Sequence, residues 1–425
     1  MGSERFERYL RAFDEEPPVS IRLNPAKAAE DEWTVAGEAV PWCRHAYYLA
    51  QRPNFTFDPL FHAGCYYVQE AASMFLDEVI RQQTVNSKSS NCKSLDLCAA
   101  PGGKSTLLRA ALPADSVLYS NEPVRSRAAV LLENVQKWGY QNHHVTNLYP
   151  RDYRKAGMKF DLILCDVPCS GEGMFRKDPA TIGEWSLQNV ERCQQLQRDI
   201  VGEAWQCLND GGILVYSTCT FNTKENEENI RWMLSAFDAE VMPIATQADW
   251  HITGSLLPGF TEPVYRFIPG ITRSEGLFMC VLRKGGVCTE ETTGLDGANQ
   301  EFGRCKPKPA KGQKKRLEGH LPAKNPVPTL APLDLHGDGP RVELTCQQAI
   351  AYLRREALTL PPDTPRGLVE VCFMGRPLGQ AKNIGSRANN LYPKEWKIKT
   401  THIPQDYEAI LRPAGPHPEG GCAER

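Results

Sequence analysis

The sequence predicts an α/β protein whose centre is a mostly parallel sheet with helices on both faces. Between residues 93 and 284, short apolar runs alternate with longer amphipathic stretches, which is the pattern of strands and helices in such a sheet. Residues 285–340 lose this periodicity and gather Gly, Pro and Lys, so a flexible linker is expected there. The remaining ends, residues 1–92 and 341–425, predict a small N-terminal α+β domain and a β-rich C-terminal domain.

The N-terminal region begins with an amphipathic pattern. Phe6, Tyr9, Leu10 and Phe13 are spaced as neighbours on one helix face, which we expect to lie in the core. Two prolines end this helix, residues 19–23 are expected to form a strand, and residues 66–82 a helix leading to the central sheet.

The central region is expected to follow a strict order of strands and helices. Strands are predicted at residues 95–97, 117–120, 144–146, 161–165 and 213–216, and helices at residues 103–111, 125–138, 187–208 and 224–237. Residues 264–268 and 277–282 predict a hairpin that closes the sheet. In the tail, strands are expected at residues 342–344, 367–373 and 377–381, and a helix at residues 346–355.

Two cysteines follow two of the buried strands. Cys169 lies in the turn Asp166-Val167-Pro168-Cys169, and Cys219 in Ser217-Thr218-Cys219-Thr220. Open α/β sheets build their sites at the carboxyl ends of strands. We therefore expect the two thiols to share one crevice, with Asp166 beside them.

A glycine-containing turn, Cys98 to Lys104, follows the first central strand. It is not a phosphate loop, because Cys98 stands where that motif requires glycine, and it lacks the spacing of the dinucleotide fingerprint. Glu122 follows the next strand, where a carboxylate can accept both hydroxyls of a ribose. A ribose without a required phosphate suggests S-adenosylmethionine.

Three long motifs resemble those of the Sun-type RNA cytosine-5 methyltransferases, most closely the bacterial ribosomal small-subunit methyltransferase F group. They are residues 96–104, 166–177 and 217–220, with further likeness at residues 64–73, 382–385 and 389–393. The likeness covers most of the chain in a consistent order.

This resemblance implies a Rossmann-like class I methyltransferase sheet, RNA-binding N-terminal residues and a C-terminal PUA-like RNA-binding domain. The reaction it implies is S-adenosylmethionine-dependent methylation of carbon 5 of a cytosine in RNA, with 16S ribosomal RNA as the expected substrate. Cys219 would attack carbon 6, Cys169 would assist product release, and Asp166 would handle charge at ring nitrogen 3. The residues expected to contact the cofactor are Cys98, Ala99, Ala100, Pro101, Gly102, Gly103, Lys104, Glu122, Asp166 and, on the adenine side, Asp152. No metal is expected.

Charge is unevenly distributed along the chain. Residues 304–425 carry 20 Lys+Arg against 12 Asp+Glu, although the whole chain has a net charge of −2. The tail is therefore expected to meet RNA, through the basic run at residues 306–316 and through Arg376, Lys382, Arg387, Lys394, Trp396, Lys397 and Lys399.

Fifteen cysteines without a C-x-x-C pair predict a reducing cytoplasm rather than a disulfide framework. No apolar run suits a membrane, and a monomer is expected. Two alternatives remain: a transfer RNA cytosine-5 methyltransferase, and a non-catalytic RNA-binding factor for ribosome assembly. DNA is disfavoured as a substrate, because DNA enzymes of this chemistry lack the second cysteine motif.

Overall fold

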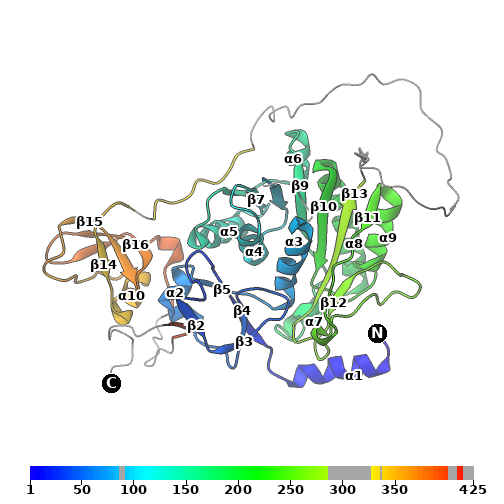
Figure 1. Cartoon of the computed structure of the whole chain (residues 1–425), viewed down its shortest axis with the longest axis horizontal. Helices are drawn as coiled ribbons and strands as arrows, with labels where there is room; N and C mark the ends of the chain where they lie inside the picture. Colours follow the sequence, from blue (N-terminus) through cyan, green and yellow to red (C-terminus); the bar gives the residue numbers. More distant parts are fainter. Residues whose placement is uncertain (86–90, 286–326, 336, 401–408, 415–425) are drawn as a thin grey trace, which may run out of the picture.

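The computed structural model describes residues 1–85, 91–285, 327–335, 337–400 and 409–414. Three parts lie side by side in Figure 1: the C-terminal sheet, the N-terminal strands and the large central sheet. The basic run at residues 306–316 lies outside the described residues, as does most of the expected linker.

The central sheet has eight strands, and seven of them follow the order β11-β13-β10-β9-β6-β7-β8 while β12 pairs with β13. Strands β10, β9, β6, β7 and β8 are parallel, and β13 runs antiparallel to its neighbours. The strands are β6 (Lys93–Asp96), β7 (Val117–Asn121), β8 (His143–Thr146), β9 (Phe160–Asp166), β10 (Leu208–Thr218), β11 (Ala239–Val241), β12 (Tyr265–Phe267) and β13 (Leu277–Lys284). The predicted mostly parallel sheet with a closing hairpin is confirmed, and β11 is an additional edge strand.

Helices cover both faces of this sheet. The helices are α3 (Phe75–Val85), α4 (Gly103–Ala111), α5 (Arg125–Trp138), α6 (Pro150–Lys155), α7 (Ala180–Glu184), α8 (Leu187–Cys207) and α9 (Glu227–Ala236). One apolar core joins α3 and α4 to the sheet through Leu107, Leu162 and Val215. A second core joins α8 and α9 to the opposite face through Val201, Ile163 and Leu214. Alternate residues of β9 and β10 thus enter opposite cores, as buried parallel strands require.

The N-terminal part is a second sheet, with strand order β3-β4-β1-β5. Its elements are β1 (Val19–Leu23), β3 (Gly37–Ala39), β4 (Ala46–Leu49), α2 (Pro59–His62) and β5 (Tyr66–Val68). The expected helix over residues 66–82 is wrong at its start, because residues 66–68 pair with β1. Pairing with a distant strand overrides the local pattern there.

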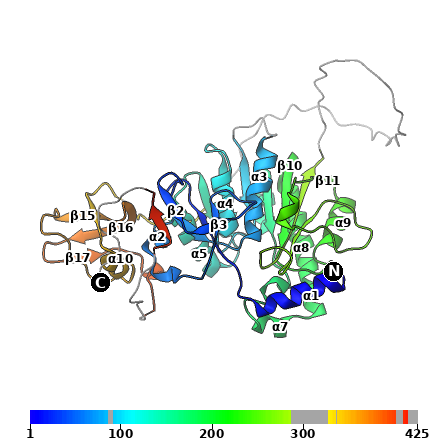
Figure 2. The same cartoon turned by 60° about the horizontal axis from the view of Figure 1, so that its bottom comes forward.

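Helix α1 (Ser3–Arg11) does not enter a core. None of its residues is buried, and the side chains of Phe6 and Leu10 are each 49% exposed. It lies along the edge of the molecule beside α7 (Figure 2), and its Tyr9 ring packs edge-on against Phe221 at 5.5 Å. The expectation that its aromatic face is core is therefore wrong.

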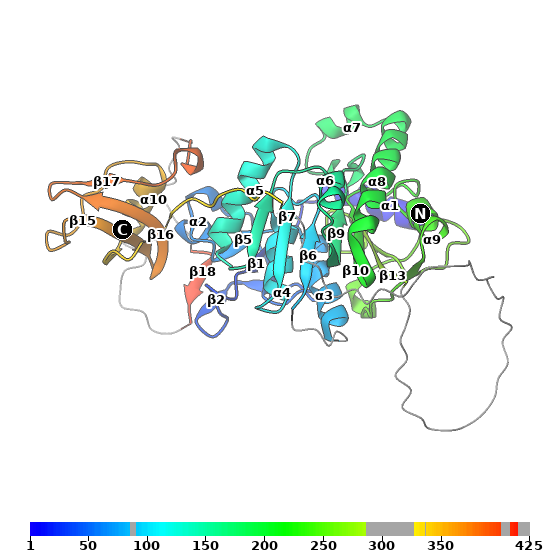
Figure 3. The same ribbon diagram turned by 90° about the horizontal axis from the view of Figure 1, so that it is seen from above.

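The C-terminal part is a sheet of order β14-β15-β16-β17 that shares its core with the N-terminal part. Its elements are β14 (Arg341–Glu343), α10 (Cys346–Leu353), β15 (Gly367–Phe373), β16 (Arg376–Asn383), β17 (Ala388–Asn390) and β18 (Leu411–Pro413). Figure 3 shows this sheet next to α2, with β18 reaching back to β2 (Trp33–Val35). Ile21 and Leu23 belong to the same apolar cluster as Val369 and Leu411. The two ends of the chain thus fold as one packed unit.

The described stretch 327–335 also contacts the central domain. The Leu330 amide donates to the Val145 carbonyl at 2.8 Å, and Gln136 Nε2 donates to the Leu333 carbonyl at 2.9 Å. This end of the expected linker is therefore held along the edge of β8.

Two residues expected to meet RNA face the protein instead. Arg376 Nη2 lies 2.6 Å from Glu32 Oε2, and its guanidinium lies 5.7 Å from the Trp33 ring. Trp396 is only 9% exposed and belongs to the shared core. The five remaining basic side chains are exposed: Lys382, Arg387, Lys394, Lys397 and Lys399.

Candidate functional site

The two cysteines meet at the carboxyl ends of β9 and β10. These strands are neighbours, with Ser217 in register with Asp166, so the turns that follow them leave the sheet together. The Cys169 and Cys219 sulfurs lie 3.3 Å apart, and both residues are half-buried. Two thiols at this distance can share one hydrogen bond.

The turn after Cys169 is docked on the turn that carries Cys219. The Gly173 amide donates to the Cys219 carbonyl at 2.7 Å, and a Cβ added at residue 173 would lie 2.4 Å from that oxygen. Only glycine permits this approach. Glu172 strengthens the contact, because its Oε2 accepts from the amides of Phe221 at 2.7 Å and Asn222 at 2.8 Å.

A lysine–carboxylate pair lies beside the thiols. Lys104 Nζ lies 2.9 Å from Asp166 Oδ2, and Ser217 Oγ donates to Asp166 Oδ1 at 2.6 Å. Burial lowers the pKa of Lys104, but the charge and hydrogen bond of Asp166 outweigh it and leave the pKa above its ordinary value. The lysine is therefore a fixed cation next to the sulfurs.

The two thiols have opposite ionisation tendencies. The hydrogen bond from Cys169 lowers the pKa of Cys219, and Lys104 acts in the same direction, against burial and Asp166. The pKa of Cys169 is raised well above its ordinary value by its hydrogen bond to Cys219 and by burial. Cys219 is thus the thiol of the pair whose surroundings favour ionisation, and the thiolate is the form of cysteine that acts as a nucleophile.

The glycine-containing turn lies at the carboxyl end of β6, next to this pair. The Ala99 amide donates to the Asn121 carbonyl at 2.8 Å, and Asn134 Nδ2 donates to the Pro101 carbonyl at 2.8 Å. Gly102 has a φ of 120°, which glycine alone adopts readily. Helix α4 begins directly after it, at Gly103, and carries Lys104 toward Asp166.

Glu122 is buried directly after β7 and near the turn. It is 2% exposed, its Oε1 accepts from the Val124 amide at 2.9 Å, and its Oε2 lies 3.3 Å from Arg127 Nη1. The Arg127 side chain is 55% exposed and can be displaced from the carboxylate. Arg127 also donates to the Ala100 carbonyl at 3.1 Å, so one side chain links the acid to the turn.

Asp152 lies farther along, in α6. Its Oδ2 accepts from the Tyr149 amide at 3.0 Å, which makes it a cap for that helix. The preceding segment folds toward the turn, since Asn147 Nδ2 donates to the Glu122 carbonyl at 2.6 Å. The structure thus brings residues 98–104, Glu122, Asp166 and both cysteines together, and gives Asp152 a capping contact.

Asp96 is a buried acid that the sequence analysis did not single out. It is 0% exposed, its Oδ2 accepts from Ser105 Oγ at 2.5 Å, and its Oδ1 has no hydrogen-bond partner among the described residues. Burial raises its pKa to about 7. Its place at the end of β6, directly before the turn, is the signal that could have identified it.

Arg22 was also missed, because it comes from a distant strand. Its Nη2 donates to Thr106 Oγ1 at 2.8 Å and to the Gly103 carbonyl at 3.3 Å, and its guanidinium lies 4.5 Å from the Trp138 ring. The N-terminal sheet therefore fixes the start of α4. No local pattern around residue 22 indicates this contact.

Three family models match successive parts of the chain. The family model described as 16S rRNA methyltransferase RsmB/F matches residues 83–283. Models of the N-terminal domain of 16S rRNA methyltransferase RsmF and of the methyltransferase RsmF PUA domain match residues 1–71 and 340–398.

Curated relatives align with most of the chain. Ribosomal RNA small subunit methyltransferase F of Pectobacterium atrosepticum is 34% identical over 300 residues, which span 67% of this chain and 60% of that relative. The protein of the same name from Shigella boydii is 29% identical over 468 residues and 92% of each chain.

Solved structures support the fold. A methyltransferase homologue from Pyrococcus horikoshii superposes with a TM-score of 0.55 at 28% identity, over 66% of this chain and 91% of that one. NSun6 from the same organism, solved with SFG, has a TM-score of 0.55 at 20% identity over 67% of this chain and 95% of that one, which supports the fold alone.

Proposed function

The chain belongs to the 16S rRNA methyltransferase RsmB/F family, and from this premise we propose that it methylates carbon 5 of a cytosine in small-subunit ribosomal RNA. The observation that carries the proposal is the pair of sulfurs 3.3 Å apart at adjacent strand ends, with a lysine–carboxylate pair beside them. Carbon 5 of cytosine is a poor nucleophile, so a protein thiolate is needed to activate the ring.

Cys219 is the proposed nucleophile. Its thiolate adds to carbon 6, and the electron pair of the 5,6 double bond moves into the ring toward nitrogen 3, which makes carbon 5 nucleophilic. Nitrogen 3 takes up a proton from water as it receives this electron pair, and Asp166, held by Ser217 and Lys104, is placed to accept a hydrogen bond from the protonated nitrogen. After methylation a base takes the proton from carbon 5, the electron pair of that bond re-forms the 5,6 double bond, and Cys219 leaves carbon 6 as a thiolate. Cys169 is proposed to assist this release.

The residues around the turn suit S-adenosylmethionine, which supplies an electrophilic methyl group on a sulfonium cation. That molecule carries two cationic centres and a ribose diol. Asp96 offers a buried carboxylate oxygen with no partner among the described residues, close to Asp166. Glu122 is proposed to accept the ribose hydroxyls once Arg127 moves away, with residues 98–104 around the cofactor and Asp152 on its adenine side.

RNA binding is proposed for both ends of the chain. The C-terminal match to a PUA domain and the five exposed basic side chains support contact with phosphates.

The proposed division of the chain is at residues 1–92, 93–284, 285–340 and 341–425, and the protein is proposed to act as a monomer in the cytoplasm. No helix of the described residues is long and apolar enough to cross a membrane, and no group of three or more metal-binding side chains occurs among them.

Bisulfite sequencing of total RNA tests the proposed function. A strain lacking the gene should lose methylation at a defined cytosine of 16S ribosomal RNA, and the wild-type gene should restore it while Cys219→Ala should not. Loss of a site in transfer RNA instead would assign that substrate. An unchanged pattern with impaired subunit assembly would favour the non-catalytic alternative.

A further inference from the structure

Cys169 and Cys219 have different charged neighbours. Lys104 and Asp166 influence Cys219, and Asp96 lies behind them on β6. Glu225 lies on the other side, next to Cys169: its Oε2 accepts from the amide of Ser170, the following residue, at 3.0 Å, and its charge raises the pKa of Cys169. This difference suggests that the surroundings, rather than the thiols themselves, decide where the shared proton lies.

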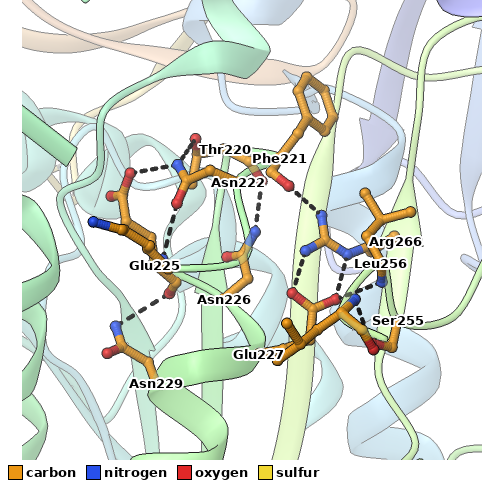
Figure 4. Close-up of polar contacts among 12 residues, drawn as sticks. Thr220, Phe221, Asn222, Glu225, Asn226, Glu227, Asn229, Ser255, Leu256 and Arg266 are labelled. Atoms are coloured by element: carbon orange, nitrogen blue, oxygen red, sulfur yellow. Dashed lines mark hydrogen bonds and ion pairs between the residues drawn. The ribbon is translucent and has the colours of Figure 1, made fainter. Parts of the chain in front are cut away.

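Glu225 is fully buried and receives only hydrogen-bond donors. Its Oε2 accepts from the Ser170 amide at 3.0 Å and from Gln197 Nε2 at 2.7 Å, and its Oε1 accepts from Asn222 Nδ2 at 2.7 Å. Figure 4 shows Asn222 and Glu225 facing each other in the loop after Thr220. No Lys, Arg or His of the described residues forms an ion pair with it within 4.0 Å. Three donors therefore hold both oxygens of this carboxylate in place.

The partners of Glu225 come from both cysteine turns. Ser170 follows Cys169 directly, and Gln197 Nε2 also donates to the carbonyl of Pro168, the residue before Cys169, at 2.9 Å. Asn222 belongs to the turn after Cys219 and also donates to Ser170 Oγ at 3.3 Å. One buried carboxylate thus holds the two turns together.

We propose that Glu225 is a positioning residue for methyl transfer: its carboxylate fixes the Cys169 turn against the Cys219 turn and keeps the shared proton on Cys169. Lys104 lies on the Cys219 side of the pair. The negative charge of Glu225 and the positive charge of Lys104 therefore both favour the proton on Cys169 and the negative charge on Cys219. Cys219 is then the thiolate before RNA binds.

The remaining titratable groups around the pair fit this arrangement. Glu172 is engaged by the amides of Phe221 and Asn222, and the Tyr216 hydroxyl donates to the Glu225 carbonyl at 2.6 Å. Burial raises the pKa of Tyr216 well above its ordinary value, so this phenol stays neutral. Asp166 opposes ionisation of Cys219, but it is paired with Lys104 at 2.9 Å.

The inference rests on the proposed use of both thiols, and it is tested on the free protein without RNA. Alkylation by iodoacetamide, resolved by peptide mass spectrometry as a function of pH, measures each thiol separately. The midpoint of each thiol is the pH at which its alkylation rate reaches half of the maximum. In Cys169→Ser, the midpoint of the remaining Cys219 should lie about one pH unit or more below the midpoint of Cys169 in Cys219→Ser. Coinciding midpoints would show that the asymmetry arises only within the pair, and would overturn the proposal.

The role of Glu225 is tested in the Cys219→Ser background. Glu225→Gln should lower the midpoint of Cys169 by about one unit, and Glu225→Asp, which keeps the charge, should shift it less. Glu78→Gln is the matched control, because Glu78 is also buried but lies in α3, where it pairs with Arg81, and it should leave the midpoint unchanged. An unmoved midpoint in a folded Glu225→Gln protein would refute the proposal.

The comparison of the two single-cysteine proteins needs no change at residue 225, so it can overturn the proposal even if Glu225→Gln does not fold, and Glu225→Asp then tests the carboxylate itself. Failure of methyl transfer to any RNA, with the expected midpoints, would count against the proposed function and leave this inference standing.

Discussion

The buried ion pair between Arg266 of β12 and Glu227 of α9 offers a quantitative test of how the Cys219 turn is held. Arg266 Nε donates to Glu227 Oε1 at 2.8 Å, and its Nη1 donates to the Phe221 carbonyl at 2.9 Å, two residues after Cys219. The two side chains face each other in Figure 4, where dashed lines mark their contacts. Both are at most 1% exposed. Glu227→Gln would leave a buried guanidinium without its counter-charge.

That change should destabilise the central domain by about 3–5 kcal/mol. For a domain of this size the melting temperature should fall by roughly 6–20 °C. Arg266→Met should cost a similar amount, since it leaves the carboxylate and the Phe221 carbonyl without their donor. Because the double variant removes both charges, its loss should be smaller than the sum of the two single losses by about 1–3 kcal/mol.

Urea unfolding of the four proteins, followed by tryptophan fluorescence, gives the required free energies. Thr34→Ala is a suitable control, because its hydroxyl contact to the Arg412 carbonyl at 3.2 Å is exposed and distant from the crevice. Additive losses, or a loss below about 1 kcal/mol for Glu227→Gln, would refute the view that this pair anchors the Cys219 turn.

Three further predictions concern the crevice and the RNA surface. Burial raises the pKa of Asp96 from 3.8 to about 7. Between these two pH values the folded protein keeps the proton while the unfolded chain loses it. The free energy of unfolding should therefore fall by roughly 4 kcal/mol as pH rises from about 4 to 7. Asp96→Asn should remove this dependence in pH-resolved thermal melts, and an unchanged slope would show that the acid titrates normally. Cys169→Ala should accumulate RNA-linked protein on denaturing gels while Cys219→Ala should not, and the reverse pattern would exchange their roles. Replacing the exposed Lys382 and Lys394 with Glu should weaken RNA binding and reduce the salt slope by about 1 per lost phosphate contact, and an unchanged slope would place the RNA elsewhere.

Local patterns were sufficient for much of the central sheet. Helix α5 begins and ends at the expected residues, 125 and 138, because a capping glycine follows directly at 139 in the left-handed region. Strands β9 and β10 were found from their apolar runs, and their parallel pairing explains why Cys169 and Cys219 meet. These features depend on residues near one another in sequence or on general rules of sheet topology.

The features of the fold and of the site that the sequence did not predict depend on contacts between residues far apart in the chain. The strand at residues 66–68 exists because β1 pairs with it, and the exposure of α1 results from its position beside Phe221 rather than over a core. Likewise Arg22 and Glu225 look like ordinary polar residues until the fold surrounds them with Thr106, Ser170 and Gln197.

The shared core of the two chain ends has a consequence for how RNA would be held. Because β18 pairs with β2, and because Arg22 of the N-terminal sheet fixes the start of α4, a continuous series of packed contacts joins the C-terminal sheet to the turn near Lys104. Lys137 adds a direct contact, with its ammonium 5.3 Å from the Trp396 ring. The exposed lysines of the C-terminal part are therefore held at a set distance from Cys219 by packing. An RNA bound to these lysines could then place at Cys219 only a cytosine that lies at this set distance from the bound segment. The choice of cytosine would therefore depend on the shape of the RNA as well as on its sequence.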